Sequence, residues 1–151
     1  MSIDQGLQAA APPGVLLARG VSRALVQRGW AVLAEVTLAN GRRADVMALD
    51  GAGTIAIVEV KSCLADFRSD RKWTEYRDYC DQLYFAVPED FPVELIPDSC
   101  GLIAADPFGA EIVRPAPLLA LNAARRKAVL LRFAHLAALR LHQFSDPASR
   151  L

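Results

Sequence analysis

The chain has 151 residues, the length of one ordinary domain, and 53% of them are hydrophobic while 23% are charged. This composition excludes a disordered, collagen-like or low-complexity protein. No apolar stretch approaches the roughly 20 residues that a membrane-spanning helix needs, and the N-terminal residues lack the pattern of a signal peptide. We therefore expect one folded domain over residues 1–151, flexible over residues 1–12, located in the cytoplasm and without contact to a membrane.

Charge is distributed unevenly, although the net charge is zero. Residues 1–43 hold five basic and two acidic residues, residues 44–111 hold five and fourteen, and residues 112–151 hold seven and one. The basic C-terminal part can bind a polyanion, or it can neutralise the acidic middle within the fold. The three cysteines form no CxxC pair, so they indicate neither a disulfide framework nor a zinc site.

The first part of the chain predicts a helix followed by three strands. Apolar residues recur at helical spacing after Pro12 and Pro13, and Gly29 ends this pattern. Three short apolar runs follow, separated by the turn signals Asn40-Gly41 and Asp50-Gly51-Ala52-Gly53. The third run is nearly continuously apolar, which is typical of a central strand covered on both faces. We expect strands over residues 31–38, 42–49 and 54–61.

The second part predicts two further helices and three further strands. A segment rich in charge and aromatic residues, 65–81, fits a helix that starts between Asp66 and Asp70. Residues 83–88 form a strand that Pro88 stops, and a strand pair follows around the turn Pro107-Phe108-Gly109. The segment from 118 to 142 contains neither glycine nor proline and predicts one long helix.

Three charged residues at the facing ends of the second and third strands carry the candidate chemistry. Glu59 and Lys61 project to the same side because side chains alternate along a strand, and Asp45 can lie one strand spacing away, about 4.8 Å. Two carboxylates at that separation suit Mg²⁺, which leaves its other positions to water and phosphate. Lys61 would then orient a water or stabilise negative charge.

A structural interpretation of the same residues is that Glu59 and Lys61 form the solvated end of a strand and that Asp45 takes part in an ordinary ion pair. Glu59, however, directly follows the apolar run from Ile55 to Val58, where an unpaired charge is costly. This position favours the metal site.

The string RRADVMAL, followed by VEVKSCLADFRSDRKWTEYRDYCDQLYFAVP, resembles the MmcB-like DNA-repair family. The strings GLIAAD, GAEIVRPAP and ARRKA extend this resemblance over nearly the whole chain. Residues 14–88 also resemble the PD-(D/E)xK nuclease superfamily. The resemblance implies an α/β fold with a restriction-endonuclease-like core, which is a helix, a three-strand antiparallel meander, a helix and a strand. An added hairpin and a long C-terminal helix complete the expected architecture.

The same resemblance implies that Asp45 and Glu59 bind Mg²⁺ or Mn²⁺ and that Lys61 is catalytic. Ala44 stands where the superfamily has a proline, and the first helix lacks the acidic residue that related nucleases often place there. Glu35 is the candidate substitute. If Ala39-Asn40-Gly41 forms a three-residue loop with Gly41 in the left-handed conformation, Glu35 lies directly across from Asp45. If Asn40-Gly41 is instead a two-residue turn, Asp45 faces Val36 and Glu35 points to the opposite side of the sheet. The structural alternative is that Glu35 is an exposed glutamate on an edge strand.

Two groups of residues are candidates for contact with nucleic acid. The first lies in the segment 65–81, where aromatic rings and cations suit stacking on bases and contact with phosphates, although Trp73 can also pack in the core. The second lies in the C-terminal helix, whose cations can alternatively hold the acidic middle segment. The candidate residues are Arg68, Arg71, Lys72, Trp73, Tyr76, Arg125, Arg126 and Lys127.

These patterns together predict a metal-dependent DNA endonuclease or structure-selective nuclease that hydrolyses phosphodiester bonds in DNA repair. The alternative is a non-catalytic nucleic-acid-binding or adaptor module on a nuclease fold. The sequence leaves open which DNA structure is bound, whether two copies of the chain form a homodimer, and whether a DNA-repair protein is a partner.

Overall fold

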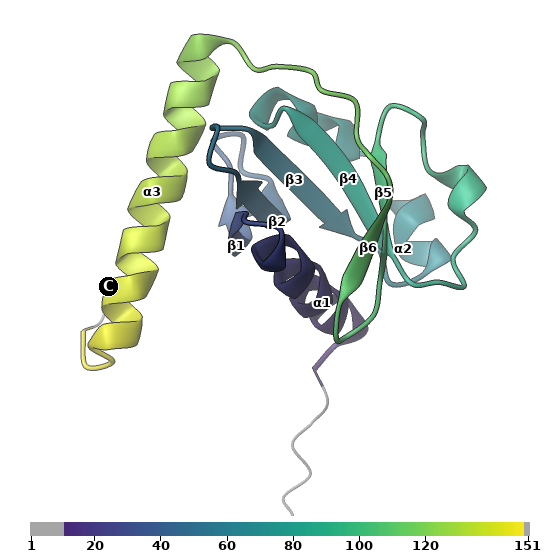
Figure 1. Ribbon diagram of the computed structural model, residues 1–151, viewed down its shortest axis with the longest axis horizontal. Helices are drawn as coiled ribbons and strands as arrows, with labels where there is room; N and C mark the ends of the chain where they lie inside the picture. The colour runs from purple at the N-terminus through teal and green to yellow at the C-terminus, as the bar shows by residue number, and fades with distance from the viewer. Residues whose placement is uncertain (1–10, 150–151) are drawn as a thin grey trace, which may run out of the picture.

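The computed structural model describes residues 11–149, which form a mixed α/β fold around one six-stranded sheet with the strand order β1-β2-β3-β4-β5-β6 (Figure 1). The pairs β1–β2, β2–β3 and β5–β6 are antiparallel, whereas β3–β4 and β4–β5 are parallel. The elements in chain order are α1 (Pro13–Gln27), β1 (Ala31–Thr37), β2 (Arg43–Leu49), β3 (Ile55–Val60), α2 (Leu64–Ser69), the 3₁₀ helix η1 (Trp73–Tyr79), β4 (Gln82–Val87), the 3₁₀ helix η2 (Val93–Leu95), β5 (Gly101–Ala105), β6 (Ala110–Arg114) and α3 (Ala123–Ser145).

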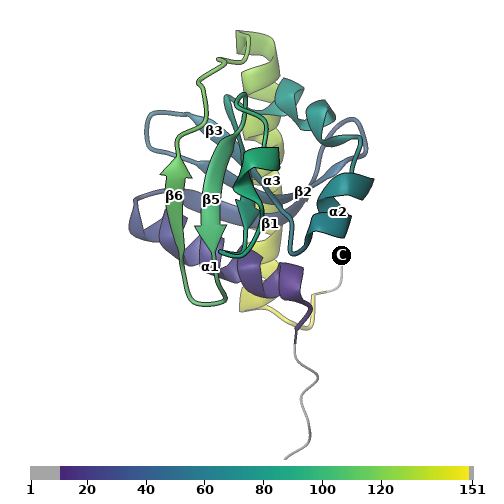
Figure 2. The same ribbon diagram turned by 90° about the vertical axis from the view of Figure 1, so that its right-hand side faces the viewer.

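One face of the sheet is covered by α1. Its buried residues Leu17, Val21 and Leu25 recur at helical spacing and pack with small and β-branched side chains of the central strands. At Gly20 the helix crosses the β5–β6 turn so closely that a Cβ atom there would lie 1.8 Å from the carbonyl oxygen of Asp106 (Figure 2). Only glycine permits this approach.

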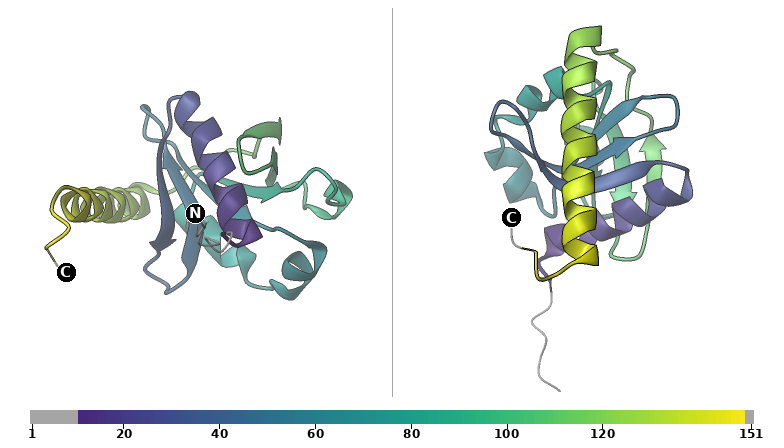
Figure 3. Two further views of the ribbon diagram at one scale, coloured as in Figure 1. Left: turned by 90° about the horizontal axis from the view of Figure 1, so that it is seen from below. Right: turned by 90° about the vertical axis from the view of Figure 1, so that its left-hand side faces the viewer.

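The opposite face is covered by α2, η1 and part of α3. Phe67 of α2 and Trp73 of η1 both pack edge-on against Phe85 of β4, with ring centroids 5.4 Å and 5.5 Å apart. The α3 helix lies against the sheet at the edge strand β1 and crosses the strand direction (Figure 3), and Val129 and Phe133 are its buried residues. Arg132 and Arg140 donate hydrogen bonds to β1 carbonyl groups, which blunts this sheet edge against pairing with another strand.

The mixed α/β class and the predicted order of elements are confirmed within residues 11–149. The single helix predicted over 65–81 is wrong, because the chain leaves the helical conformation at Asp70 and continues as η1. The long C-terminal helix begins at Ala123 rather than 118, because Asn122 caps it and the preceding residues bond to Asp81. The predicted flexibility of residues 1–12 falls outside the described residues, except at positions 11 and 12. No helix within residues 11–149 combines the length and apolarity needed to cross a membrane.

Candidate active site

The β1–β2 connection determines which residues face each other at the site. The Leu38 N–H donates to the Arg42 carbonyl at 2.7 Å, and Gly41 has φ +84°, so Ala39-Asn40-Gly41 forms the predicted three-residue loop. Val36 pairs with Ala44, and Ala34 pairs with Val46. Glu35 therefore lies directly across from Asp45, as the three-residue loop predicts.

At Glu35 and Asp45, both strands interrupt the regular alternation of side chains between the two faces of the sheet. Glu35 has φ +51°, which is uncommon for a residue other than glycine. Glu35 and its neighbour Ala34 both line a cavity of about 530 Å³ beneath α1. On β2, Asp45 lines this cavity and its neighbour Val46 packs in the cluster that contains α1. The break therefore turns Glu35 and Asp45 toward α1 together.

Glu35 nevertheless does not complete a cluster of carboxylates. Its side chain is 62% exposed, and its nearest cation is Arg43 at 3.9 Å. Over residues 11–149, no three His, Cys, Asp or Glu side chains gather closely enough to hold a metal ion. The structure thus brings Glu35 to the same cavity as Asp45 without adding it to the carboxyl pair described next.

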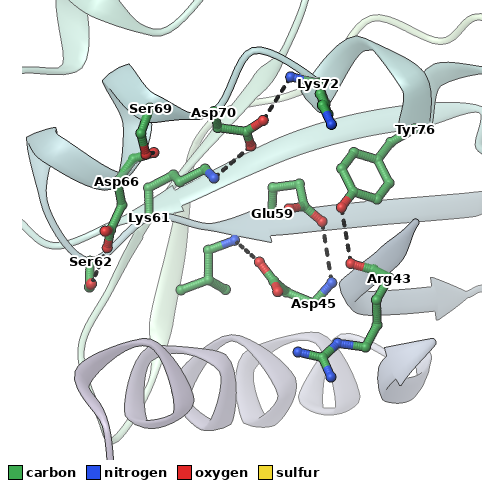
Figure 4. A network of polar contacts seen from close by, with 11 residues as sticks. Arg43, Asp45, Glu59, Lys61, Ser62, Asp66, Ser69, Asp70, Lys72 and Tyr76 are labelled. Atoms are coloured by element: carbon green, nitrogen blue, oxygen red, sulfur yellow. Dashed lines mark hydrogen bonds and ion pairs between the residues drawn. The ribbon is translucent and has the colours of Figure 1, made fainter. Parts of the chain in front are cut away.

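Asp45 and Glu59 meet where β2 and β3 diverge. Backbone pairing of these strands reaches Val46 and Val58, so Asp45 and Glu59 occupy the next opposed positions. There the Asp45 N–H donates to Glu59 Oε1 at 3.2 Å, and the Val60 N–H donates to Asp45 Oδ2 at 2.8 Å (Figure 4). Each carboxyl group therefore accepts a hydrogen bond from the opposite strand in place of a backbone carbonyl, which fixes both side chains.

Burial makes this pair costly to ionise. Glu59 is 4% exposed, and burial together with the neighbouring Asp45 charge raises its pKa from 4.5 to about 9. Burial also raises the pKa of Asp45, against the opposing effects of the Val60 N–H and the Lys61 charge. At neutral pH the isolated pair therefore holds a proton on Glu59. A bound cation would remove this penalty and allow both groups to ionise.

Lys61 lies beside the pair but is held by another carboxylate. Its Nζ donates to Asp70 Oδ2 at 2.6 Å, and both side chains are largely buried. Burial alone would raise the pKa of Asp70, but hydrogen bonds from Lys61 and the Lys72 N–H hold it below its usual value. Sequence reasoning did not select Asp70 as a site residue. In the sequence, Asp70 stands near the expected start of a helix, and this position indicates only a helix cap.

The aromatic residues predicted to contact nucleic acid are largely inside the fold. Tyr76 is buried and donates its hydroxyl to the Arg43 carbonyl at 3.0 Å. Its pKa is raised by burial and by the charges of Glu59 and Asp45, so it remains a neutral donor. Trp73 packs against Phe85, as expected from the alternative in which this residue belongs to the core. Tyr76 is therefore absent from the surface expected for base stacking, whereas Trp73 packs against the core and is partly exposed.

The cations of the same segment remain on the surface. Arg68, Arg71 and Lys72 are exposed and flank Asp70, close to Lys61. Two α1 residues that the sequence candidates did not include, Arg19 and Arg23, line the cavity that Asp45 also lines. Cations therefore stand on both sides of the carboxyl pair.

The α3 cations have different surroundings. Arg126 makes a bidentate ion pair with the buried Asp81, at 2.5 and 2.8 Å. Asp81 also accepts hydrogen bonds from the backbone of Ile55 and Leu121. Arg126 therefore connects α3 to the start of β3. This contact matches the alternative in which the basic C-terminal part neutralises the acidic middle of the chain. Arg125 lies over the Tyr79 ring, 4.5 Å from its centroid, and Lys127 is exposed.

Comparison with known proteins agrees with this architecture. The family model described as DNA repair protein MmcB-like matches residues 5–148. The chain belongs to the MmcB-like family. A solved structure, the SPO1766 protein of unknown function from Silicibacter pomeroyi, is 45% identical to this MmcB-like chain with a TM-score of 0.90. The match covers 93% of this chain and 97% of that one. No curated protein matches the chain.

The arrangement defines what this MmcB-like site can do chemically. The buried Glu59 and the half-buried Asp45 offer hard oxygen ligands, and the Lys61 ammonium group follows Glu59 just beyond the end of β3. Such a set can hold a divalent cation and stabilise negative charge on a phosphate.

Proposed function

We propose that the protein is a metal-dependent DNA endonuclease or structure-selective nuclease that hydrolyses phosphodiester bonds in DNA repair, on a PD-(D/E)xK nuclease fold. The observation that carries this proposal is the buried Asp45–Glu59 pair at the point where β2 and β3 diverge. Lys61 follows Glu59 by two residues and lies next to the pair. Membership of a family described as DNA repair proteins supports DNA as the substrate.

The donor set fits Mg²⁺ or Mn²⁺. Mg²⁺ commonly uses one or two carboxylates and fills its remaining positions with water and substrate phosphate. Asp45 and Glu59 supply those carboxylates, and a bound divalent cation would offset the effect of burial and of the Asp45 charge, which together raise the pKa of Glu59. The chemistry that a bound Mg²⁺ supplies is activation of a water and neutralisation of charge on the phosphate.

The chain's own residues position the substrate and the charges. Arg19 and Arg23 line the cavity next to Asp45 and attract the phosphodiester, which the acidic pair alone would repel. The hydrogen bonds from the Asp45 and Val60 N–H groups hold the two carboxyl groups in place. The Lys61 ammonium group is the cation available to stabilise charge that develops on the phosphate oxygens. Asp70 holds that ammonium group in position by accepting its hydrogen bond.

A second candidate function is a non-catalytic nucleic-acid-binding or adaptor module. The 2.6 Å ion pair between Lys61 and Asp70 favours it, because a lysine held by a carboxylate is partly neutralised before substrate arrives. In that role the carboxyl pair would contribute only to the structure of the sheet.

The test is a Mg²⁺ and Mn²⁺ titration of cleavage on nicked, flapped, branched and single-stranded DNA. The nuclease proposal predicts metal-dependent cleavage of at least one substrate by the wild-type protein, and loss of this cleavage in Lys61→Ala. A control is Arg28→Ala, which removes an exposed cation at the end of α1. Binding of DNA without cleavage in either metal would instead support the adaptor module.

A further inference from the structure

A second cavity, of about 420 Å³, lies between α3 and the β1–β2 hairpin. Its lining includes Leu38 and Met47, which belong to the hydrophobic cluster on the side of the sheet opposite to α1. The cavity that Asp45 lines is under α1, on the other side. We refer to the cavity beside α3 as the α3 groove. A ligand in it would not compete for the carboxyl pair.

The charged residues that line the α3 groove are both positive. Arg125 and Arg132 both line it, whereas none of its lining residues is acidic. The two arginines are two helical turns apart, which is about 10.5 Å along the axis. Neither has an acidic partner within 4 Å among the described residues. The residues of α3, 123–145, include no Asp or Glu at all. The charge around the groove therefore favours an anionic ligand.

Between the two arginines the groove is apolar. Leu38 of the β1–β2 connection, Met47 of β2 and Val129 of α3 form its almost fully buried base, and the exposed Ala124 and Ala128 leave room along α3. Leu131 is 62% exposed one turn further along the helix. A volume of this size accepts one or two large apolar side chains.

The chemistry of the lining favours a peptide over a nucleic acid. The guanidinium group of Arg125 covers the Tyr79 ring at 4.5 Å, so this ring offers no free face to a base. The Asn122 side-chain oxygen is bound to the Arg125 N–H at 2.8 Å as a helix cap. Aliphatic side chains supply no hydrogen bonds to base edges, but they suit a leucine or phenylalanine anchor.

We propose that the α3 groove binds a short acidic segment of a protein partner, in which carboxylates flank a large apolar side chain. The carboxylates pair with Arg125 and Arg132, and the apolar side chain enters the groove between them against Ala124 and Ala128. This contact joins the protein to a partner on the face of the sheet opposite to the cavity that Asp45 lines.

Fluorescence anisotropy with a defined probe tests the proposal. The probe is a fluorescein-labelled octapeptide, Gly-Asp-Glu-Leu-Phe-Glu-Asp-Gly, compared with a peptide that has lysine at each acidic position. We expect saturable binding of the acidic peptide below about 1 mM and none of the basic one. Arg125→Glu and Arg132→Glu should each weaken binding by about tenfold or more, because each removes a charge-assisted contact.

Two further variants separate binding from folding. Lys127→Glu makes the same charge change at an exposed α3 residue that does not line the groove, and it should alter peptide binding by less than about twofold. Ala128→Trp fills the groove without changing charge and should abolish peptide binding, provided that thermal unfolding shows an intact fold.

Three results would overturn the proposal. The first is the absence of saturable binding of the acidic peptide. The second is binding of a fluorescein-labelled single-stranded octanucleotide that Arg125→Glu and Arg132→Glu abolish while peptide binding persists, which would assign the groove to nucleic acid. The third is self-association of the wild-type chain that Ala128→Trp abolishes, measured by sedimentation, which would assign the groove to a second copy.

Discussion

Asp45 and Glu59 are joined through the backbone: the N–H of Asp45 donates to the Glu59 carboxyl group, and the Asp45 carboxylate accepts from the residue after Glu59. This reciprocal arrangement ends the β2–β3 ladder with side chains. It explains how two acidic residues remain ordered at a largely buried position. It also makes their protonation part of the stability of the fold.

Glu59→Gln should change the pH dependence of stability in the absence of divalent metal. The folded-state pKa of Glu59, about 9, lies above the ordinary value of 4.5, so the folded chain holds a proton that the unfolded chain releases between these values. The contribution of Glu59 to the stability of the wild-type fold should therefore be largest at or below pH 4.5. It should decrease as the pH rises toward 9. Glutamine still accepts the Asp45 N–H and carries no titrating proton, so the fall should flatten. Calorimetric Tm values across this pH range in EDTA measure the effect.

The matched control for this experiment is Glu111→Gln, which alters an exposed glutamate on β6 and should retain the wild-type profile. Parallel Tm profiles for wild type and Glu59→Gln would contradict the assignment of the raised pKa to Glu59.

Arg126→Ala should destabilise the fold strongly. Asp81 is 3% exposed, and its carboxylate holds the start of β3, the segment before α3 and Arg126 together. Removing the guanidinium group leaves a buried charge without its ion-pair partner, which costs about 3 kcal/mol. Urea denaturation measures the free energy of unfolding, with Lys127→Ala as the neighbouring control, for which we expect a change below about 0.5 kcal/mol. Equal losses in the two variants would show that the Arg126–Asp81 pair contributes no net stability.

Gly20→Ala and Gly14→Ala should shift stability in opposite directions, although both positions lie in α1. At Gly20 the added Cβ would collide with the Asp106 carbonyl oxygen, so α1 or the β5–β6 turn must shift at a cost of about 2 kcal/mol. At Gly14 nothing lies within 4 Å, and alanine should stabilise the helix by up to about 1 kcal/mol. Thermal unfolding of the two variants checks the difference. A Gly20→Ala variant as stable as wild type would mean that α1 does not cross the turn this closely.

Replacing Arg68, Arg71 and Lys72 with alanine together should reduce the salt dependence of DNA binding. These exposed cations flank Asp70, which holds Lys61, so they lie on the site side of the molecule. Each duplex phosphate contact contributes about −0.9 to the slope of log K against log salt, so the slope should flatten by up to about three units.

The matched control for that triple is the replacement of Arg125, Lys127 and Arg132 with alanine, which removes the same charge from α3. The slope should remain close to that of wild type in this variant, because two of these residues line the α3 groove on the opposite face. If the α3 triple flattens the slope and the first triple does not, the DNA-binding surface lies on α3 instead.

Local patterns were sufficient to predict the strands, the β1–β2 loop and the register that opposes Glu35 to Asp45. The glycine at position 41 and the alternation of apolar residues act over a few positions, so they are visible in the sequence. The break in alternation at Glu35 was not visible, because nothing in its residue type requires a positive φ.

The remaining differences arise from contacts between distant residues. The helix predicted over 65–81 ends at Asp70 because that side chain bonds to Lys61 and to the following backbone. Arg126 is neutralised by Asp81, which lies 45 residues away. The buried position of Tyr76 depends on the Arg43 carbonyl. These pairings cannot be predicted from helical propensity or from the number of charges in a segment.

The most direct test of the proposed nuclease site is the single-turnover rate of DNA cleavage in Mg²⁺ by Asp45→Asn, compared with Asp98→Asn. Asparagine at position 45 can still accept the Val60 N–H, so the fold should persist while the anionic metal ligand is lost. Asp98 is fully exposed and serves as the matched carboxylate control. We predict a decrease of about 10²-fold or more for Asp45→Asn and an unchanged rate for Asp98→Asn. A folded Asp45→Asn variant that cleaves DNA at the wild-type rate would contradict the assignment of the Asp45–Glu59 pair as the catalytic metal site.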